Sequence, residues 1–140
     1  MSIHAEPELA FEEHRTVERL LQPLERAGFT VERPLGGLAT AFRASRTFGR
    51  SGPRIALLAE YDALPELGHA CGHNLIGTAA VGAAVTAAEQ LERSSVDFTL
   101  EVVGCPAEEG GGGKILLIEA GAFNGVDAAL MFHPSHRTMP

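Results

Sequence analysis

The chain has 140 residues, of which 45% are hydrophobic and 21% are charged, and its formal net charge is -7. These values fit about one domain with a buried core. The negative charge and the lack of a basic cluster exclude a nucleic-acid partner, because a phosphate-binding surface needs lysine and arginine gathered on one face. No membrane partner is expected either, since the most apolar stretch, residues 75–88, is shorter than the roughly 20 residues that cross a bilayer. The acidic, polar N-terminus resembles neither a secretory signal nor a transit peptide, which predicts a cytoplasmic protein.

The pattern of apolar residues predicts alternating helices and strands. Residues 7–27 form an amphipathic helical pattern that ends at Gly28, with Pro23 as a place for a kink or break. The remaining predicted elements are short strands at 29–33 and 38–44, a loop at 46–53, a central strand at 54–61, a helix at 75–91, a strand at 96–104, a helix at 114–123 and a strand at 127–133. This order predicts an α/β fold: a three-layer, mostly parallel twisted sheet with helices on both faces.

Three polar loops, each following a predicted central strand, carry the residues that can bind a metal or take part in catalysis. They offer Glu60, Asp62, His69, Cys71 and His73 in the first loop, Glu108 and Glu109 in the second, and His133 and His136 in the third. Because the carboxyl ends of parallel strands share one edge of a sheet, these loops are expected to converge there. Imidazole, thiolate and carboxylate groups are the donors that a zinc-like ion selects. The sequence therefore predicts a metal site at that edge.

The spacing within two of the loops suggests how such a site works. Cys71 and His73 are separated by Gly72, so both can point into one pocket from an extended loop. In the pair Glu108 and Glu109, one carboxylate can bind metal while its neighbour serves as general base toward a water whose pKa the metal lowers.

Two other chemistries compete with a metal site. The "GGGGKI" stretch does not fit a phosphate-binding loop, because Glu108 stands at the first glycine position and Ile115 follows Lys114 in place of serine or threonine. A cysteine hydrolase with Cys71 as nucleophile and a nearby histidine as base stays open, but it leaves the glutamate pair and His133 without a role. His4, His14 and His69 are taken as non-ligands, and Cys105 as a core residue.

Three motifs in order strongly resemble a known superfamily. They read "EYDALPELGHACGHNLIGTAAVGAA", "PAEEGGGGK" and "DAALMFHPS", and "PELAFEE" near the N-terminus fits the same branch. The chain resembles the metal-dependent amidohydrolases related to aminoacylase, hippurate hydrolase and glutamate carboxypeptidase. Within that superfamily it is most similar to the branch of aminobenzoyl-glutamate hydrolase and the β-alanyl-lysine dipeptidases.

The resemblance implies a role for each candidate residue. Cys71 would bridge two metal ions, and His73, Glu109 and His133 would be further ligands. Glu108 would be the general base. Asp62 would orient a ligand, whereas metal binding is not carried over to Glu60, which stands where distant relatives place a histidine.

The resemblance also implies a function and a boundary. It implies a divalent metal, zinc or manganese, in a two-metal site, and hydrolysis of an amide bond in an N-acyl amino acid, aminobenzoyl-glutamate or a dipeptide. Members of the family are much longer, with a lid domain that makes a homodimer and a last metal-binding histidine beyond the position of Pro140. Residues 1–140 are therefore expected to be the N-terminal part of the catalytic domain, without the lid. The alternative is an inactive fragment that acts at most as a metal-binding or interaction module.

Overall fold

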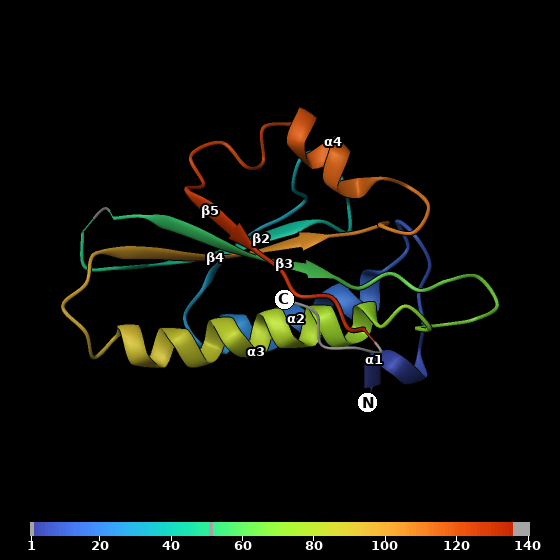
Figure 1. Cartoon of the computed structure of the whole chain (residues 1–140), viewed down its shortest axis with the longest axis horizontal. Helices are drawn as coiled ribbons and strands as arrows, with labels where there is room; N and C mark the ends of the chain where they lie inside the picture. The colour runs from blue at the N-terminus through green and yellow to red at the C-terminus, as the bar shows by residue number, and fades with distance from the viewer. Residues whose placement is uncertain (1, 51, 136–140) are drawn as a thin grey trace.

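The computed structural model describes residues 2–50 and 52–135 of the chain. Within them, helices and strands alternate around one sheet, as Figure 1 shows. In chain order the elements are α1 (Ser2–Ala5), α2 (His14–Arg26), β1 (Thr30–Glu32), β2 (Phe42–Phe48), β3 (Arg54–Glu60), α3 (His73–Leu91), β4 (Phe98–Cys105), α4 (Gly113–Glu119) and β5 (Ala128–Leu130). None of these helices combines the length and apolar character needed to span a membrane.

The five strands form one sheet in the order β1-β2-β4-β3-β5. Strand β3 lies between β4 and β5 and is parallel to both, whereas β2 runs antiparallel to β1 and to β4. The α/β class and the initial hairpin are confirmed, with the sheet mixed in direction. Since β3, β4 and β5 are parallel, their carboxyl ends lie at one edge, where the three polar loops that follow them meet.

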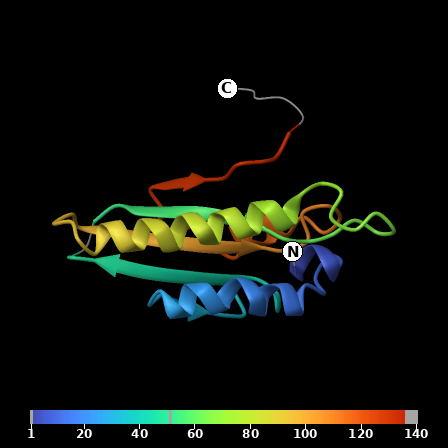
Figure 2. The ribbon, with the colours of Figure 1, turned by 90° about the horizontal axis from the view of Figure 1, so that it is seen from below.

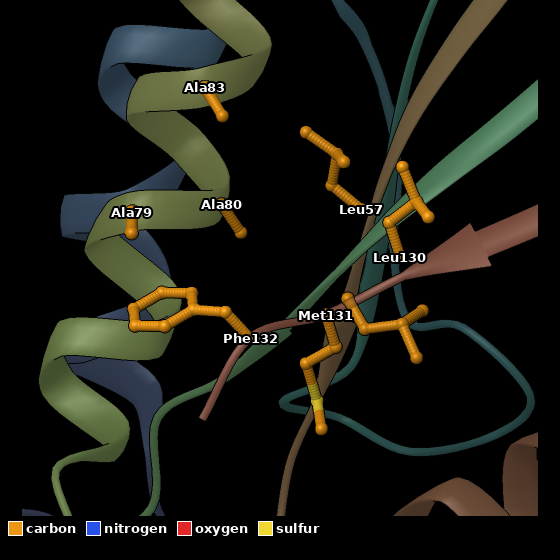
Figure 3. Close-up of a pocket in the computed structure, with 8 residues that line it drawn as sticks. Leu57, Ala79, Ala80, Ala83, Leu130, Met131 and Phe132 are labelled. Carbon is orange, nitrogen blue, oxygen red and sulfur yellow. The ribbon is translucent and has the colours of Figure 1, made fainter. Parts of the chain in front are cut away.

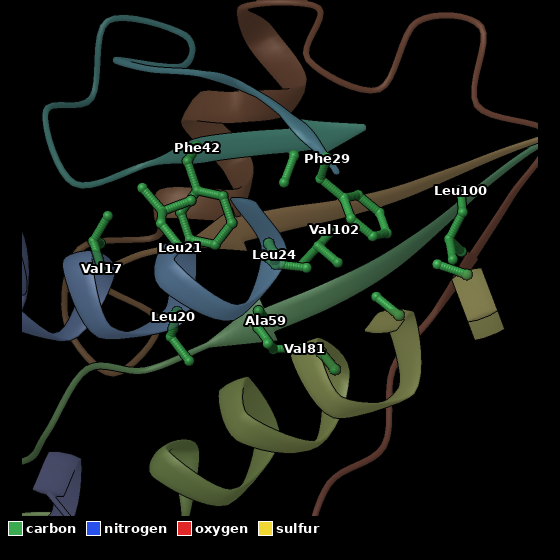
Figure 4. Close-up of a cluster of buried hydrophobic side chains, with 14 of the residues drawn as sticks. Val17, Leu20, Leu21, Leu24, Phe29, Phe42, Ala59, Val81, Leu100 and Val102 are labelled. Carbon is green, nitrogen blue, oxygen red and sulfur yellow. The ribbon is translucent and has the colours of Figure 1, made fainter. Parts of the chain in front are cut away.

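Helices cover both faces of the sheet, and each face has its own core. The larger core packs α2 and α3 against β2, β3 and β4, with side chains such as Leu24, Phe42, Ala59 and Val102 (Figure 4). Both helices run across that face in Figure 2. A smaller core around Val103 and Leu117 lies beneath α4 on the opposite face. Strand β4 is buried through most of its length, which is typical of a central strand.

Several predicted boundaries were wrong. The predicted strand at 38–44 begins only at Phe42, the predicted helix at 114–123 ends at Glu119, and the predicted strand at 127–133 is reduced to Ala128–Leu130. Helix α2 begins at His14, because residues 7–13 form a separate irregular segment; it then continues through Pro23, held by the buried leucines Leu20, Leu21 and Leu24. The predicted loop at 46–53 includes the end of β2. Those strand residues pair with β4 although Arg46 and Thr47 lack the apolar character that marks a strand.

Strand β5 forms one edge of the sheet, and its last residue and the two that follow leave apolar side chains exposed to solvent. Leu130, Met131 and Phe132 are 56%, 46% and 48% exposed. Together with Leu57 of β3 and alanines of α3 they line a shallow groove, in which Phe132 lies over the Ala79 side of the helix (Figure 3).

Candidate metal centre

The predicted convergence of the three loops is confirmed. Asp62 follows β3, the glutamate pair follows β4 and His133 follows β5, while Cys71 and His73 lie at the start of α3. Two compact groups of donor atoms result: Cys71, His73 and His133 form one, and His73, Glu108 and Glu109 form the other. The donor atoms within each group lie within 4.8 Å of one another.

His73 is the centre of the arrangement because it belongs to both groups. It is the first residue of α3 and is fully buried, after the left-handed N-cap residue Gly72. Its Nδ1–H donates to Asp62 Oδ1 at 2.8 Å, and Asp62 Oδ2 accepts the backbone N–H of Glu109 at 2.9 Å. Asp62 therefore orients the imidazole and ties the second loop to the first. Holding the proton on Nδ1 leaves Nε2 with its lone pair free.

Burial and charge act in opposite directions on this pair. Burial by itself lowers the pKa of His73, but the hydrogen bond and charge of Asp62, with the charges of Glu60 and Glu109, raise it overall. Burial alone raises the pKa of Asp62, but the bonds from His73 and the Glu109 backbone lower it overall. Asp62 is therefore held in its ionised form, and His73 is surrounded by negative charge.

The buried Nε2 atom of His73 has no hydrogen-bond partner among the described residues. It faces three carboxylate oxygens: Glu60 Oε2 at 3.5 Å, Glu108 Oε2 at 3.8 Å and Glu109 Oε1 at 3.8 Å. A buried polar atom without a partner is costly, and oxygens clustered around an imidazole nitrogen suit a cation. These residues therefore fit a divalent metal ion.

Cys71 and His133 form the other side of the centre. The Cys71 Sγ atom lies 3.4 Å from His133 Nε2, and His133 Nδ1–H donates to the Pro134 carbonyl at 2.8 Å. This bond leaves the Nε2 lone pair of His133 directed at the same space as the thiol. Burial, with the Glu109 hydrogen bond and the surrounding carboxylates, raises the pKa of Cys71 to about 11. Without a metal, Cys71 is therefore a thiol and a poor nucleophile at neutral pH.

Sequence reasoning missed one ion pair at the centre. Lys114, near the start of α4, contacts Glu60 Oε1 and lies 3.9 Å from Glu108 Oε1. The Glu60 side chain is 2% exposed, and a buried carboxylate requires a partner. The sequence offered one signal for this partner, since Lys114 is its only lysine.

The other histidines lie outside the two donor groups. His69 is buried beside His4, with ring centroids 6.4 Å apart, and His14 is exposed. Cys105 is fully buried at the end of β4, as its core interpretation predicts. His136 lies outside the described residues.

A match between the sequence and the profile of a protein family identifies the family of this chain. The profile of "Peptidase family M20/M25/M40" matches residues 56–140, a stretch that contains all the candidate residues. The chain belongs to this peptidase family. The resemblance seen in the three motifs is thereby confirmed.

Curated relatives support the same branch of the M20 family. The chain is 46% identical to a subunit of the p-aminobenzoyl-glutamate hydrolase of Escherichia coli, over 91% of this chain and 30% of that protein. It is 49% identical to the mouse Xaa-Arg dipeptidase, over 96% of this chain and 33% of that protein. The M20 chain thus spans about a third of the length of the curated relatives it matches.

The fold agrees with solved structures of the family. A dinuclear metal-binding peptidase of the M20 family from Bacillus subtilis superposes with a TM-score of 0.80 and 29% identity, over 91% of this chain and 39% of that one. An aminobenzoyl-glutamate utilization protein from Klebsiella pneumoniae has the same fold, with a TM-score of 0.69.

Proposed function

We propose that residues 1–140 are the N-terminal part of the catalytic domain of a metal-dependent amidohydrolase. The buried Nε2 of His73, which has no partner in the part of the chain that the structure describes, carries the proposal. It faces carboxylates, and His73 also offers a donor atom within 4.8 Å of those of Cys71 and His133. The dinuclear relative from Bacillus subtilis supports a divalent metal at this place. We propose zinc or manganese in a two-metal site, since the thiolate, imidazole and carboxylate donors suit both ions.

Each site residue has a role in this proposal. His73, His133, Glu109 and Cys71 would hold the metal ions. A bound divalent ion polarises a carbonyl group and lowers the pKa of water. Asp62 acts through His73, whose ring it holds in the tautomer that leaves Nε2 free.

Glu108 is the general base. Its side chain is 40% exposed, whereas that of Glu109 is 23% exposed, so Glu108 is the glutamate that incoming water and substrate can reach. Glu108 takes a proton from the attacking water and then gives it to the leaving amine. Lys114, 3.9 Å from its carboxylate, helps to hold its direction.

The substrate proposed is a small amide: an N-acyl amino acid, aminobenzoyl-glutamate or a dipeptide. The names of two curated relatives described above, a p-aminobenzoyl-glutamate hydrolase and an Xaa-Arg dipeptidase, support this class. We propose a cytoplasmic location, where a free thiol such as Cys71 stays reduced. A lid domain and a homodimer stay predictions from the family resemblance.

The test is metal binding and turnover by the purified chain. The chain is incubated with Zn²⁺ or Mn²⁺ and a panel of N-acyl amino acids, aminobenzoyl-glutamate and dipeptides, with Glu108→Gln as the matched variant. Hydrolysis that is lost in Glu108→Gln while metal content is kept supports the proposal. Bound metal without turnover on any substrate supports the alternative, an inactive metal-binding module. Absence of bound metal in protein purified without chelators would contradict both.

A further inference from the structure

The irregular segment of residues 7–13 lies between α1 and α2 and outside the part of the chain that the family profile matches. It holds none of the candidate ligands. It is nevertheless anchored at both ends: the carboxylate of Glu8 accepts the backbone N–H groups of Arg15 and Thr16 at the start of α2, and Glu13 is fully buried. An ordered segment without a site residue requires another reason for its position.

Glu13 reaches the loop that carries the glutamate pair. Its Oε1 accepts the backbone N–H of Ala107 at 2.9 Å, across 94 residues of sequence. Ala107 is fully buried and has φ 56, a left-handed conformation that a residue with a side chain rarely adopts. Such a conformation persists only where its surroundings hold it, and Glu108 follows directly. The Glu13 carboxylate thus fixes the backbone immediately before the general base.

Two more contacts join the segment to the site loops. The Glu8 carbonyl accepts the N–H of Ala63 at 2.8 Å, one residue after Asp62. The Phe11 ring packs on the other end of the glutamate loop: a Cβ atom on Gly111 would lie 2.4 Å from Phe11 Cε2. The segment therefore contacts the loop after β3 and the loop after β4 at the same time.

We propose that residues 7–13 are a brace that sets the spacing of the two ligand-bearing loops, with Glu13 as the positioning residue. The purpose of the brace, the alignment of Glu108 and Glu109 toward a metal, rests on the proposed function. The contacts that form the brace are independent of that function.

The experiment compares Glu13→Leu, which removes the acceptor, with Glu13→Gln, which keeps an acceptor oxygen. Glu12→Gln is the matched control, because Glu12 is adjacent and its side chain is 75% exposed. Amide hydrogen exchange of residues 105–113 is measured without metal, and Zn²⁺ affinity is measured by calorimetry.

We expect Glu13→Leu to speed exchange in residues 105–113 far more than in α3, and to weaken Zn²⁺ binding by about 10-fold, the usual order for a residue acting behind a ligand. Glu13→Gln is expected to restore most of both, and Glu12→Gln to change neither. Uniformly faster exchange with unchanged Zn²⁺ affinity would overturn the proposal, as would a glutamine variant no better than leucine.

Two further measurements cover a variant that does not fold and a chain that does not bind metal. If Glu13→Leu does not fold, Phe11→Ala replaces it, since Phe11 is 36% exposed and its truncation is expected to cost less folding stability. Unchanged exchange in residues 105–113 would then overturn the brace. If the unmodified chain binds neither Zn²⁺ nor Mn²⁺, the proposed function fails, while the exchange measurement still decides the brace.

Discussion

The Nδ1 atom of His73 lies 2.8 Å from the Oδ1 atom of Asp62, and both side chains are buried. The two residues are 11 positions apart, on the loop after β3 and at the first residue of α3. This bond fixes the ring plane of His73 and the nitrogen that carries its proton. It therefore determines which nitrogen is available to a metal.

Asp62→Asn is expected to weaken Zn²⁺ binding by about 10- to 100-fold, because the amide supplies no charge and presents a donor to either His73 or the Glu109 N–H. Calorimetric titration with Zn²⁺ measures the change. Asp127→Asn is the control, since that carboxylate accepts the Arg54 N–H at the opposite end of β3. Equal affinities for all three proteins would contradict the role given to Asp62.

Metal uptake is expected to release a proton from Cys71. The pKa of this thiol is raised to about 11, so it is protonated at neutral pH and must lose its proton to become a ligand. The apparent affinity should therefore rise about tenfold per pH unit between about pH 8 and 9 from this group alone. Calorimetry in buffers of different ionisation enthalpy counts the protons. Cys71→Ala should release one proton fewer, and an identical count would remove Cys71 from the ligand set.

Gly77→Ala is expected to destabilise the chain by about 1–3 kcal/mol. Helix α3 approaches β3 so closely there that a Cβ atom would lie 2.8 Å from the backbone oxygen of Glu60 and 3.3 Å from Leu20 Cδ1. Gly82→Ala in the same helix meets no atom within 4 Å and should instead stabilise by roughly 0.5–1 kcal/mol. Denaturant unfolding of both variants measures the two signs. A stabilising Gly77→Ala would show that α3 is not packed this closely.

Glu8→Gln is expected to cost about 1 kcal/mol near neutral pH, because the amide loses the negative charge and one of the two oxygens that accept the Arg15 and Thr16 N–H groups at the start of α2. Burial raises the pKa of Glu8, but the bonds from Thr16 and Arg15 lower it overall. The folded protein therefore binds this proton less readily than the unfolded chain. The stabilisation is complete above the unfolded pKa of about 4.5 and is lost as pH falls through the lower folded pKa.

Unfolding free energies measured from about pH 6 down to pH 3 should therefore show the gap between Glu8→Gln and the unmodified chain narrowing. Glu12→Gln, at an exposed position, provides the baseline. A gap that stays constant with pH would mean that the charge of Glu8 contributes nothing.

Much of the centre could be predicted because its residues have few other reasons to occur together. Thiol, imidazole and carboxylate groups after three central strands pointed to a common edge, and the parallel strands place Cys71, His73, Glu109 and His133 there. The central strands themselves were visible as apolar runs, since both of their faces are covered.

The remaining features depend on partners distant in sequence. Residues 7–13 continue a helical apolar pattern, but the cap of α2 comes from Glu8, seven and eight positions before the amides that it accepts. The charged Glu101 in β4 is buried because Arg43 and Arg54 come from two other strands to meet it. No local pattern encodes such tertiary contacts.

The three-residue strand β5 has a consequence for local unfolding. It pairs with β3 alone among the described strands, Leu130 is 56% exposed, and His133 lies three residues beyond it. An edge so lightly held is the part of a sheet that frays first. In the proposed metal site, an ion shared by Cys71 and His133, 62 residues apart, would tie that edge to the start of α3. A metal bound at the centre would thus protect β5 from amide hydrogen exchange and proteolysis. Loss of the metal would first cause fraying of this strand.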